Sequence, residues 1–226
     1  MVALPHMPFI RANTKSVFKQ ACDTYDLVYF GVVSQHSDEH QMVRGFTLSP
    51  SHVDRHYCVG TVAGRDVVLL ERTDTISFPD KPSKAYSWLI LQVDLSRSQP
   101  LHVVLNSFHY DAHVYATLFS KLSHLHKHDQ HSLNEYDQAF LSHFAVYAPW
   151  QLSDRLSDVL QPQTANILGH HFHQFDYEIL QDELIIYLPV VTPSASNIEH
   201  IFKAGIWLAE QIDPADAGPS VDGQNE

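Results

Sequence analysis

Histidines are concentrated in the stretch SHLHKHDQH at residues 123–131. Four of them lie there: His124, His126, His128 and His131. In an extended segment the first three would point to one face, and the fourth could fold back onto them. Zinc needs three or four such ligands at about 2.0–2.1 Å in a tetrahedral arrangement, and structural zinc sites rarely draw them all from one loop. Only Asp129 adds a carboxylate nearby. We therefore expect a solvated loop between two helices rather than a specific metal site.

A second group lies in HYDAH at residues 109–113. His109 and His113 are four residues apart and would share one face of a helix, which Asp111 would not join. If the segment is instead the turn before a helix, all three side chains could converge on a metal ion. Asp111 is also suited to be the N-cap of the following helix, and we favour that interpretation.

A third group lies in HHFHQFD at residues 170–176. His170 and His173 would share a helical face, with Phe172 and Phe175 turned to the core. The C-terminus of a helix favours cationic side chains without any ligand. We therefore expect these histidines to complement the helix dipole rather than to bind a metal.

Two further histidine groups have weaker chemical patterns. His36 and His40 flank acidic residues in a polar, loop-like segment. His52 lies close to Asp54 and His56, which suggests acid–base chemistry, but nothing in the sequence places a nucleophile beside them. We assign no catalytic, cofactor-binding or metal residue from either group.

The common catalytic and nucleotide-binding motifs are absent from the sequence. It contains no GxGxxG, no GxxxxGK[ST], no GxSxG and no HExxH. We therefore expect no cofactor, and a protein that is not an enzyme is the favoured interpretation.

The composition argues against nucleic-acid binding. The 226 residues carry a net charge of −12 with neutral histidines, and no local basic patch offsets it. An acidic surface repels phosphate backbones and anionic membrane surfaces. No apolar run approaches the roughly 20 residues that span a bilayer. The first fifteen residues do not read as a secretory signal, so we expect a soluble, cytoplasmic protein.

Cys22 and Cys58 are the two cysteines of the chain. Two cysteines without a CxxC motif exclude a dense disulfide framework. A single bridge between them stays open, but reduced thiols are the simpler expectation for a cytoplasmic protein.

The first half of the chain reads as strands. Alternating and β-branched runs predict strands at 27–33, 86–95 and 101–106, the last antiparallel to its predecessor, and a hairpin at 57–72 that turns at 63–66. Residues 73–84 contain Pro79 and Pro82, and we expect them to leave the sheet.

The second half alternates helices with strands. Helical periodicity and caps predict helices at 14–22, 111–125, 132–144, 153–160, 162–174 and 196–212. Two segments are capping boxes of the Ser-x-x-Glu type: SLNE at 132–135 and SNIE at 196–199. A strand at 144–149 and a hairpin around Gln181 and Asp182 complete the pattern. Trp88, Trp150 and Trp207 lie in apolar surroundings and read as core or interface residues.

Together these elements indicate an α+β fold, in which antiparallel hairpins and a sheet pack with several helices. We expect a partly irregular N-terminal segment at 1–24, one compact domain at 25–212 and a disordered acidic tail at 213–226. A weak boundary between two lobes is placed near 126–134.

The order of four segments resembles a family of uncharacterised bacterial proteins that share a domain of unknown function. The segments are GTVAGRDVVLLERTDT, WLILQVDLSR, FAVYAPWQLSDRLSDVLQPQTANIL and FDYEILQDELIIYLP. They cover roughly residues 57–190. Members of the family often carry N-terminal transmembrane helices, which this sequence lacks, and the histidine-rich stretch at 123–131 has no counterpart in it. The resemblance supplies no catalytic residues.

Two functional hypotheses follow from the sequence. The first is a non-enzymatic soluble module that binds a partner protein or a small ligand. The alternative is a metal-binding protein or metal-dependent enzyme that uses His109, Asp111 and His113, or the histidines of 124–131.

Overall fold

The computed structural model describes residues 8–32, 43–78, 81–108, 112–129, 132–150 and 155–214. The predicted histidine pair His36 and His40 therefore lies outside the described residues, as do His109, Asp111 and His131. Residues 215–226 lie outside them too.

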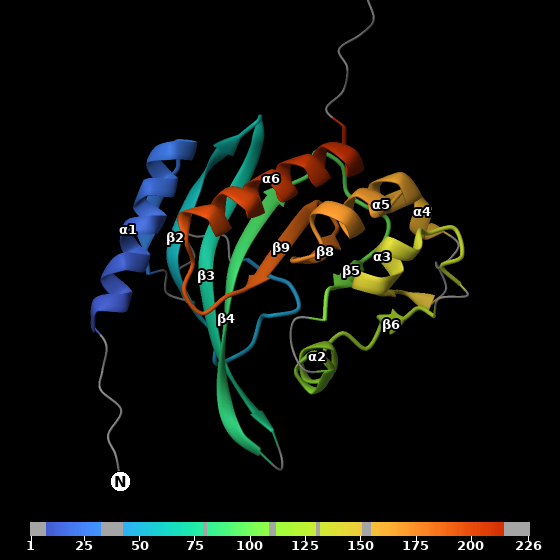
Figure 1. The fold of residues 1–226 in the computed structure, drawn as a ribbon, viewed down its shortest axis with the longest axis horizontal. Coiled ribbons are helices and arrows are strands. Elements are labelled where there is room, and N and C mark those ends of the chain that lie inside the picture. Colours follow the sequence, from blue (N-terminus) through green and yellow to red (C-terminus); the bar gives the residue numbers. More distant parts are fainter. Residues whose placement is uncertain are drawn as a thin grey trace, which may run out of the picture.

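A sheet of nine antiparallel strands is the centre of the described structure (Figure 1). The strands are β1 (Val28–Gly31), β2 (Val53–Val62), β3 (Arg65–Phe78), β4 (Lys81–Asp94), β5 (Val103–Asn106), β6 (His126–Lys127), β7 (Ala145–Ala148), β8 (Asp176–Leu180) and β9 (Glu183–Pro189). Their order across the sheet is β1-β2-β3-β4-β9-β8-β5-β7-β6. With the helices this confirms the predicted α+β class.

The described residues form six helices, which pack on the sheet or on one another. They are α1 (Pro8–Tyr25), α2 (Ala112–Phe119), α3 (Gln138–His143), α4 (Leu156–Val159), α5 (Pro162–His171) and α6 (Ala195–Ile212). α2 stands apart from the other five in Figure 1. None of the helices in the described part of the chain is both long and apolar enough to cross a membrane.

The strands bury two different faces, because successive side chains point to opposite sides of a sheet. In β4, Leu89, Leu91 and Val93 join a core that also contains side chains of α1, α3, α4, α5 and α6. We call this side the helical face. Trp88 and Ile90 of the same strand join a second core with α2 and with Val43 and Phe46. We call this side, covered by α2 and residues 43–52, the loop face.

The hairpin of β3 and β4 is longer than the sequence predicts. Residues 73–84 were expected to leave the sheet, but the paired register continues from Val67↔Val93 to Phe78↔Lys81. The expectation was wrong because Pro82 lies beside the tip of the hairpin, where few ladder bonds remain for a proline to remove. Pro79 lies outside the described residues.

Two-residue turns close the predicted hairpins. β2 and β3 are joined at Ala63 and Gly64, with φ angles of 52° and 78°. Positive φ at both central residues is the geometry that continues the twist of the strands. Arg65 and Asp66, predicted to be in the turn, already belong to β3. The other hairpin turns at Gln181 and Asp182, as expected.

The neighbours of β5 differ from the prediction. β5 was expected to lie antiparallel to its predecessor, β4, but it pairs with β7 and β8. The hairpin of β8 and β9 lies between β4 and β5, because β9 pairs with β4. This pairing of distant segments leaves no local signal in the sequence.

Helix starts also differ from the capping signals. α3 begins after Asp137, whose carboxylate accepts the N–H of Ala139, and not at the SLNE segment, which forms turns. α6 begins after Ser194, which forms a capping box with Asn197 two residues before the predicted one. Asparagine can fill this position because its side-chain oxygen accepts the N–H of Ser194 at 3.0 Å.

The two ends of the described chain are more ordered than expected. α1 extends through residues 8–25, beyond the predicted helix at 14–22. Asp213, assigned to the tail, is buried and accepts a hydrogen bond from Arg65 at 3.1 Å. Burial by itself would raise the pKa of Asp213, but the contact with Arg65 and the N–H of Ser96 together lower it. The ion pair therefore fixes the end of α6 to the start of β3.

Candidate functional site

A groove of about 660 Å³ lies on the helical face between α1 and α6. Val17, Ala21 and Tyr25 of α1 form one wall, and α6 forms the other. α6 contributes Ile198, Phe202, Ile206 and Trp207 to the groove. The walls are thus mainly apolar, which is typical of small-ligand sites.

The sequence of α6 explains its position. Ile198, Ile201 and Leu208 are buried against the sheet, as the helical periodicity predicts. Gly205 lets the helix approach closely, since a Cβ there would lie 2.8 Å from Cδ2 of Leu91. Ile206 and Trp207 extend the apolar surface beyond this stripe, and they turn toward the groove.

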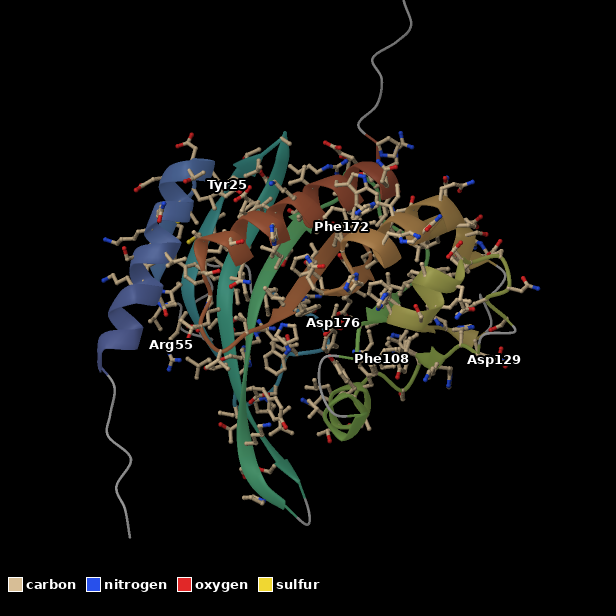
Figure 2. All side chains as sticks on the ribbon, viewed as in Figure 1. Tyr25, Arg55, Phe108, Asp129, Phe172 and Asp176 are labelled. Atoms are coloured by element: carbon tan, nitrogen blue, oxygen red, sulfur yellow. The ribbon has the colours of Figure 1, made fainter. Side chains whose placement is uncertain are left out.

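Aromatic rings stack in and beside the groove. Tyr25 points from the end of α1 toward α6 (Figure 2) and stacks on Phe202, with the ring centroids 4.0 Å apart. Burial, and next the charge of Glu199, raise the pKa of Tyr25. Trp207 stacks on Phe172, with the centroids 5.3 Å apart. The groove therefore offers flat, uncharged aromatic surfaces.

Three charged residues of α6 lie at the rim. Lys203 donates to Glu199 at 2.6 Å. This contact lowers the pKa of Glu199 and raises that of Lys203. Glu210 makes no hydrogen bond or ion pair with another described residue, so among the described lining residues the acidic side chains outnumber the basic one by one.

The loop face contains a buried polar chain centred on Glu178 of β8. Its Oε2 accepts the N–H of Phe46 at 2.8 Å and the hydroxyl of Tyr187 at 2.6 Å. Its Oε1 lies 2.7 Å from Nε2 of His102. Nδ1 of His102 in turn lies 2.8 Å from Nε2 of the exposed His124.

The hydrogen-bonded series Glu178–His102–His124 could move a proton or accept one. A carboxylate that accepts Nε2–H of His102 leaves Nδ1 of that ring as an acceptor for His124. His124 would then present its own Nδ1 as a base. A reaction would also need a substrate site, and His102 and His124 line neither the groove nor the smaller cavity described below. Burial, with the neighbouring His102, lowers the pKa of His124.

A second buried carboxylate, Asp176, anchors the start of β8 (Figure 2). Its Oδ1 accepts the N–H and the hydroxyl of Ser107, each at 2.7 Å, and its Oδ2 accepts the hydroxyl of Tyr115 at 3.0 Å. Asn106 donates to the same carboxylate at 3.3 Å. These contacts hold α2 against the sheet, which is a structural role.

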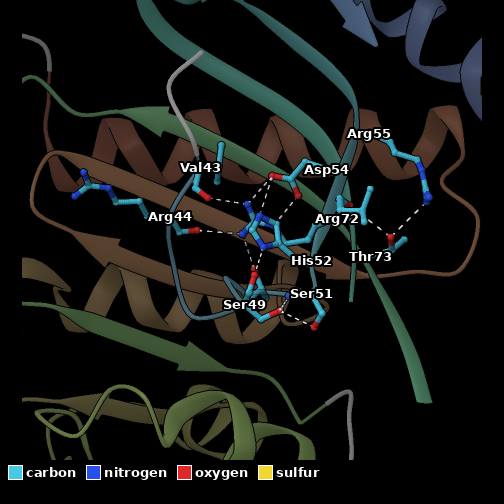
Figure 3. A network of polar contacts seen from close by, with 11 residues as sticks. Val43, Arg44, Ser49, Ser51, His52, Asp54, Arg55, Arg72 and Thr73 are labelled. Carbon is cyan, nitrogen blue, oxygen red and sulfur yellow. Dashed lines mark hydrogen bonds and ion pairs between the residues drawn. The ribbon is translucent and has the colours of Figure 1, made fainter. Parts of the chain in front are cut away.

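Arg72 forms the third buried polar centre of the loop face (Figure 3). Its guanidinium donates to both carboxylate oxygens of Asp54 at 2.8 Å. It also donates to the carbonyl oxygens of Val43 and Arg44 and to the hydroxyl of Thr47. The contacts with Val43, Arg44 and Thr47 tie residues 43–47 to the sheet, and the pair with Asp54 joins β3 to β2, so this network is also structural.

The predicted group of His52, Asp54 and His56 does not converge. His52 lies 3.9 Å from Asp54, which is engaged by Arg72. His56 sits in a bulge of β2 and points elsewhere, with its Nδ1 2.8 Å from the hydroxyl of Tyr29. The structure therefore offers no shared acid–base site for the three residues.

The histidine-rich stretch is not simply a solvated loop. His126 and Lys127 form the edge strand β6, paired with Ala148 and Tyr147. His128 is buried and stacks on Trp150, with the centroids 5.5 Å apart. The sequence did not predict this strand, because only two polar residues form it and its pairing partner, β7, is supplied by another segment of the chain. His124 faces His102 instead of joining the others.

His128 borders a smaller cavity of about 300 Å³. Both its ring nitrogens are buried, and neither has a hydrogen-bond partner among the described residues. Lys127 and Phe108 also line this cavity, with the ammonium 5.7 Å from the ring centroid.

The predicted pair of His170 and His173 does not share a helix. His170 lies in the last turn of α5, as predicted, but the helix ends at His171. His173 stacks on His143 at 4.3 Å between ring centroids. The side chain of His113 lies outside the described part. No group of three or more His, Cys, Asp or Glu side chains suited to a metal ion occurs within the described ranges.

The tryptophans take different positions. Trp88 is fully buried in the core of the loop face, as expected for a core residue. Trp150 is 57% exposed, and Trp207 lines the groove. The groove itself was not predicted, because it depends on α1 and α6 lying side by side although they are at opposite ends of the chain.

Comparisons with known proteins give little further guidance. No protein-family model matches the sequence, and no curated protein matches it. Among solved structures, the crystal structure of the mycobacterial trehalose monomycolate transport factor A, TtfA, is similar with a TM-score of 0.49. The two chains are 10% identical over 91% of this chain and 93% of that one. A likeness of this size carries no argument about function, and the resemblance to an uncharacterised bacterial family stays a prediction.

Proposed function

We propose that this protein is a non-enzymatic binding module and that the groove between α1 and α6 holds a small, mainly apolar molecule. The groove carries the proposal because its volume of about 660 Å³ lies within the range of roughly 300–1,000 Å³ typical of small-ligand sites. A partner protein, the other occupant suggested by the sequence, would need a broader surface.

The walls of the groove indicate the body of the ligand. Tyr25, Phe202 and Trp207 present aromatic rings, and Val17 and Ile206 add aliphatic surface. Each methylene group moved from water to such surroundings contributes about 0.8 kcal/mol. A hydrocarbon chain therefore suits the groove better than a polar metabolite does.

The rim indicates the head group. Lys203 is neutralised by Glu199, whereas Glu210 is not paired with any described residue. A cationic head near Glu210 would gain a modest attraction and an anionic head would be repelled. We therefore expect affinity to fall from an alkylamine to the alcohol and then to the carboxylate of equal chain length.

The fluorescence of Trp207, which lines the groove, can report binding. In a Trp150→Phe background, the remaining tryptophans are the buried Trp88 and the groove residue Trp207. Dodecylamine, dodecanol and dodecanoate, each below its micelle concentration, should change the fluorescence in a saturable way and in that order of affinity. A response that does not saturate for any of the three probes would contradict the proposal.

Two matched variants on α1 test the location. Thr24 lines the groove and is exposed, whereas Ser16 is exposed on the same helix but does not line it. We expect Thr24→Phe to weaken binding by about tenfold, equivalent to about 1.4 kcal/mol, and Ser16→Phe to leave it unchanged. Equal effects of the two variants would place the ligand elsewhere.

The head-group preference has its own variant. Glu210→Gln removes the unpaired charge without changing the size of the side chain. It should reduce the difference in affinity between the alkylamine and the alcohol while the affinity for the alcohol stays the same.

A further inference from the structure

We propose that Cys22 and Cys58 are a disulfide site: when the chain folds in the presence of a small disulfide oxidant, they form a covalent bond that fixes α1 to β2. The two sulfur atoms lie 2.8 Å apart. Both residues are buried, Cys22 in α1 and Cys58 in β2. This inference does not depend on the ligand proposed for the groove.

The distance between the sulfurs is the first support. Non-bonded carbon atoms pack at roughly 3.5–4.0 Å, and sulfur is larger than carbon. A bonded pair of sulfurs is separated by about 2.05 Å. The observed 2.8 Å lies between the two values, so bond formation needs a movement of less than an ångström.

The surroundings of the pair are the second support. Cys58 is held in the sheet, since it pairs with Tyr29 on one side and Leu69 on the other. Cys22 is held by the packing of α1, in which Phe18 and Ala21 are buried beside it. The bond would therefore join two elements that already meet, and would not have to draw them together.

The chemistry indicates when the bond forms. Burial is the main cause that raises the pKa of both thiols, so little of the reactive thiolate is present in the folded protein. The bond is therefore expected to form before α1 has packed fully, and to resist reduction afterwards.

Each step of the reaction is balanced with oxidised glutathione as the oxidant. The thiolate of Cys22 attacks one sulfur of the oxidant and displaces one glutathione thiolate, which leaves a mixed disulfide. The thiolate of Cys58 then attacks the sulfur of Cys22 and displaces the second glutathione. The protein loses two protons and two electrons, and the oxidant becomes two reduced thiols.

The bond would stabilise the wall of the groove. It joins residues separated by 36 positions, and closing a loop of that size restricts the unfolded chain. The expected effect is a rise in Tm of roughly 10 °C for a chain of this length. Reduced protein would keep α1 in place through apolar packing alone.

The test is refolding of the full chain from urea with a mixture of reduced and oxidised glutathione. Intact mass should show the loss of two hydrogens, and a proteolytic digest should yield a peptide pair linked through Cys22 and Cys58. The Tm should fall by roughly 10 °C when the same sample is reduced with a phosphine while unfolded and then refolded.

Cys22→Ala is the control, because alanine suits the helix and removes the bond. Its Tm should be the same with and without the oxidant, whatever its absolute value. A folded wild-type protein in which both thiols remain free, or which contains only glutathione adducts or intermolecular bonds, would overturn the proposal. A bond that forms without any rise in Tm would overturn the stabilising role.

Discussion

The two faces of the sheet are buried by different kinds of contact. The core of the helical face consists of apolar side chains from the strands and from α1, α3, α4, α5 and α6. The loop face is covered by α2 and residues 43–52, and charged side chains are buried among its apolar ones. Arg72, Asp176 and Glu178 lie there, each with several partners, and Asp54 is paired with Arg72.

The difference follows from what covers each face. Amphipathic helices satisfy their own backbone groups and need only apolar surface beneath them. An irregular segment such as 43–52 exposes N–H and carbonyl groups that must be paired when buried. Arg72 and Glu178 supply those partners, since they contact the backbone of Val43, Arg44 and Phe46. Directional contacts dominate on the loop face, whereas apolar packing dominates on the helical face, where the pair of Arg65 and Asp213 fixes the end of α6 and the groove lies between α1 and α6.

The largest loss of stability is expected from breaking the Arg72 centre. Arg72→Met leaves the carboxylate of Asp54 buried without its main partner, which costs about 3–5 kcal/mol of unfolding free energy. Urea denaturation measures the loss. The double variant with Asp54→Leu should recover part of it, because no buried charge is then left unpaired. If single and double variants are equally unstable, the ion pair is not what fixes the loop.

Gly45 gives the next largest effect, also on the loop face. Its φ is +95°, and a Cβ there would collide with the hydroxyl of Tyr187 and lie 2.7 Å from Oε2 of Glu178. Gly45→Ala should therefore cost about 3 kcal/mol, from backbone strain and overpacking together. Urea unfolding gives the free energy, and a loss below that of the next variant would contradict the ranking of the two faces.

Gly205 is the matched position on the helical face. A Cβ there would lie 2.8 Å from Leu91 and 3.0 Å from Ile186, both of them flexible apolar side chains. The overpacking is partly offset by the better helix propensity of alanine, so Gly205→Ala should cost only about 1 kcal/mol. Urea unfolding measures this loss of unfolding free energy too. A loss equal to that of Gly45→Ala would show that the helices cannot shift.

The same contrast explains which parts could be predicted from the sequence. Periodicity indicates β4, the two tight hairpins and α6, because these elements depend on local pattern. The segment FDYEIL alternates apolar and acidic residues, which ordinarily means that the acidic side faces water. Here Asp176 and Glu178 are buried instead, because residues from distant segments cover them. The groove was missed for a related reason, since it is formed by the two ends of the chain.

The smallest expected effect is a change in how the unfolding free energy depends on pH. It can be compared for one histidine on each face, His56 and His124. His56 stacks on Phe18 of α1, with the ring centroids 4.9 Å apart. Burial, followed by the charges of Arg55 and Lys15, lowers its pKa below 6.5, although Glu71 lies 3.9 Å away. In the window between that lowered pKa and about 6.5, the unfolded chain binds more protons than the folded one.

The contribution of His56 to stability is therefore complete above about pH 6.5 and is lost as the pH falls through this window. Replacing it with asparagine, which tolerates its positive φ, should flatten the dependence of the unfolding free energy on pH. His124→Asn should flatten it less, because His124 is exposed although its pKa is lowered too. Urea unfolding at a series of pH values around 6 measures both slopes. A larger change for His124 would mean that the polar chain to Glu178, and not the packing of α1, governs stability in acid.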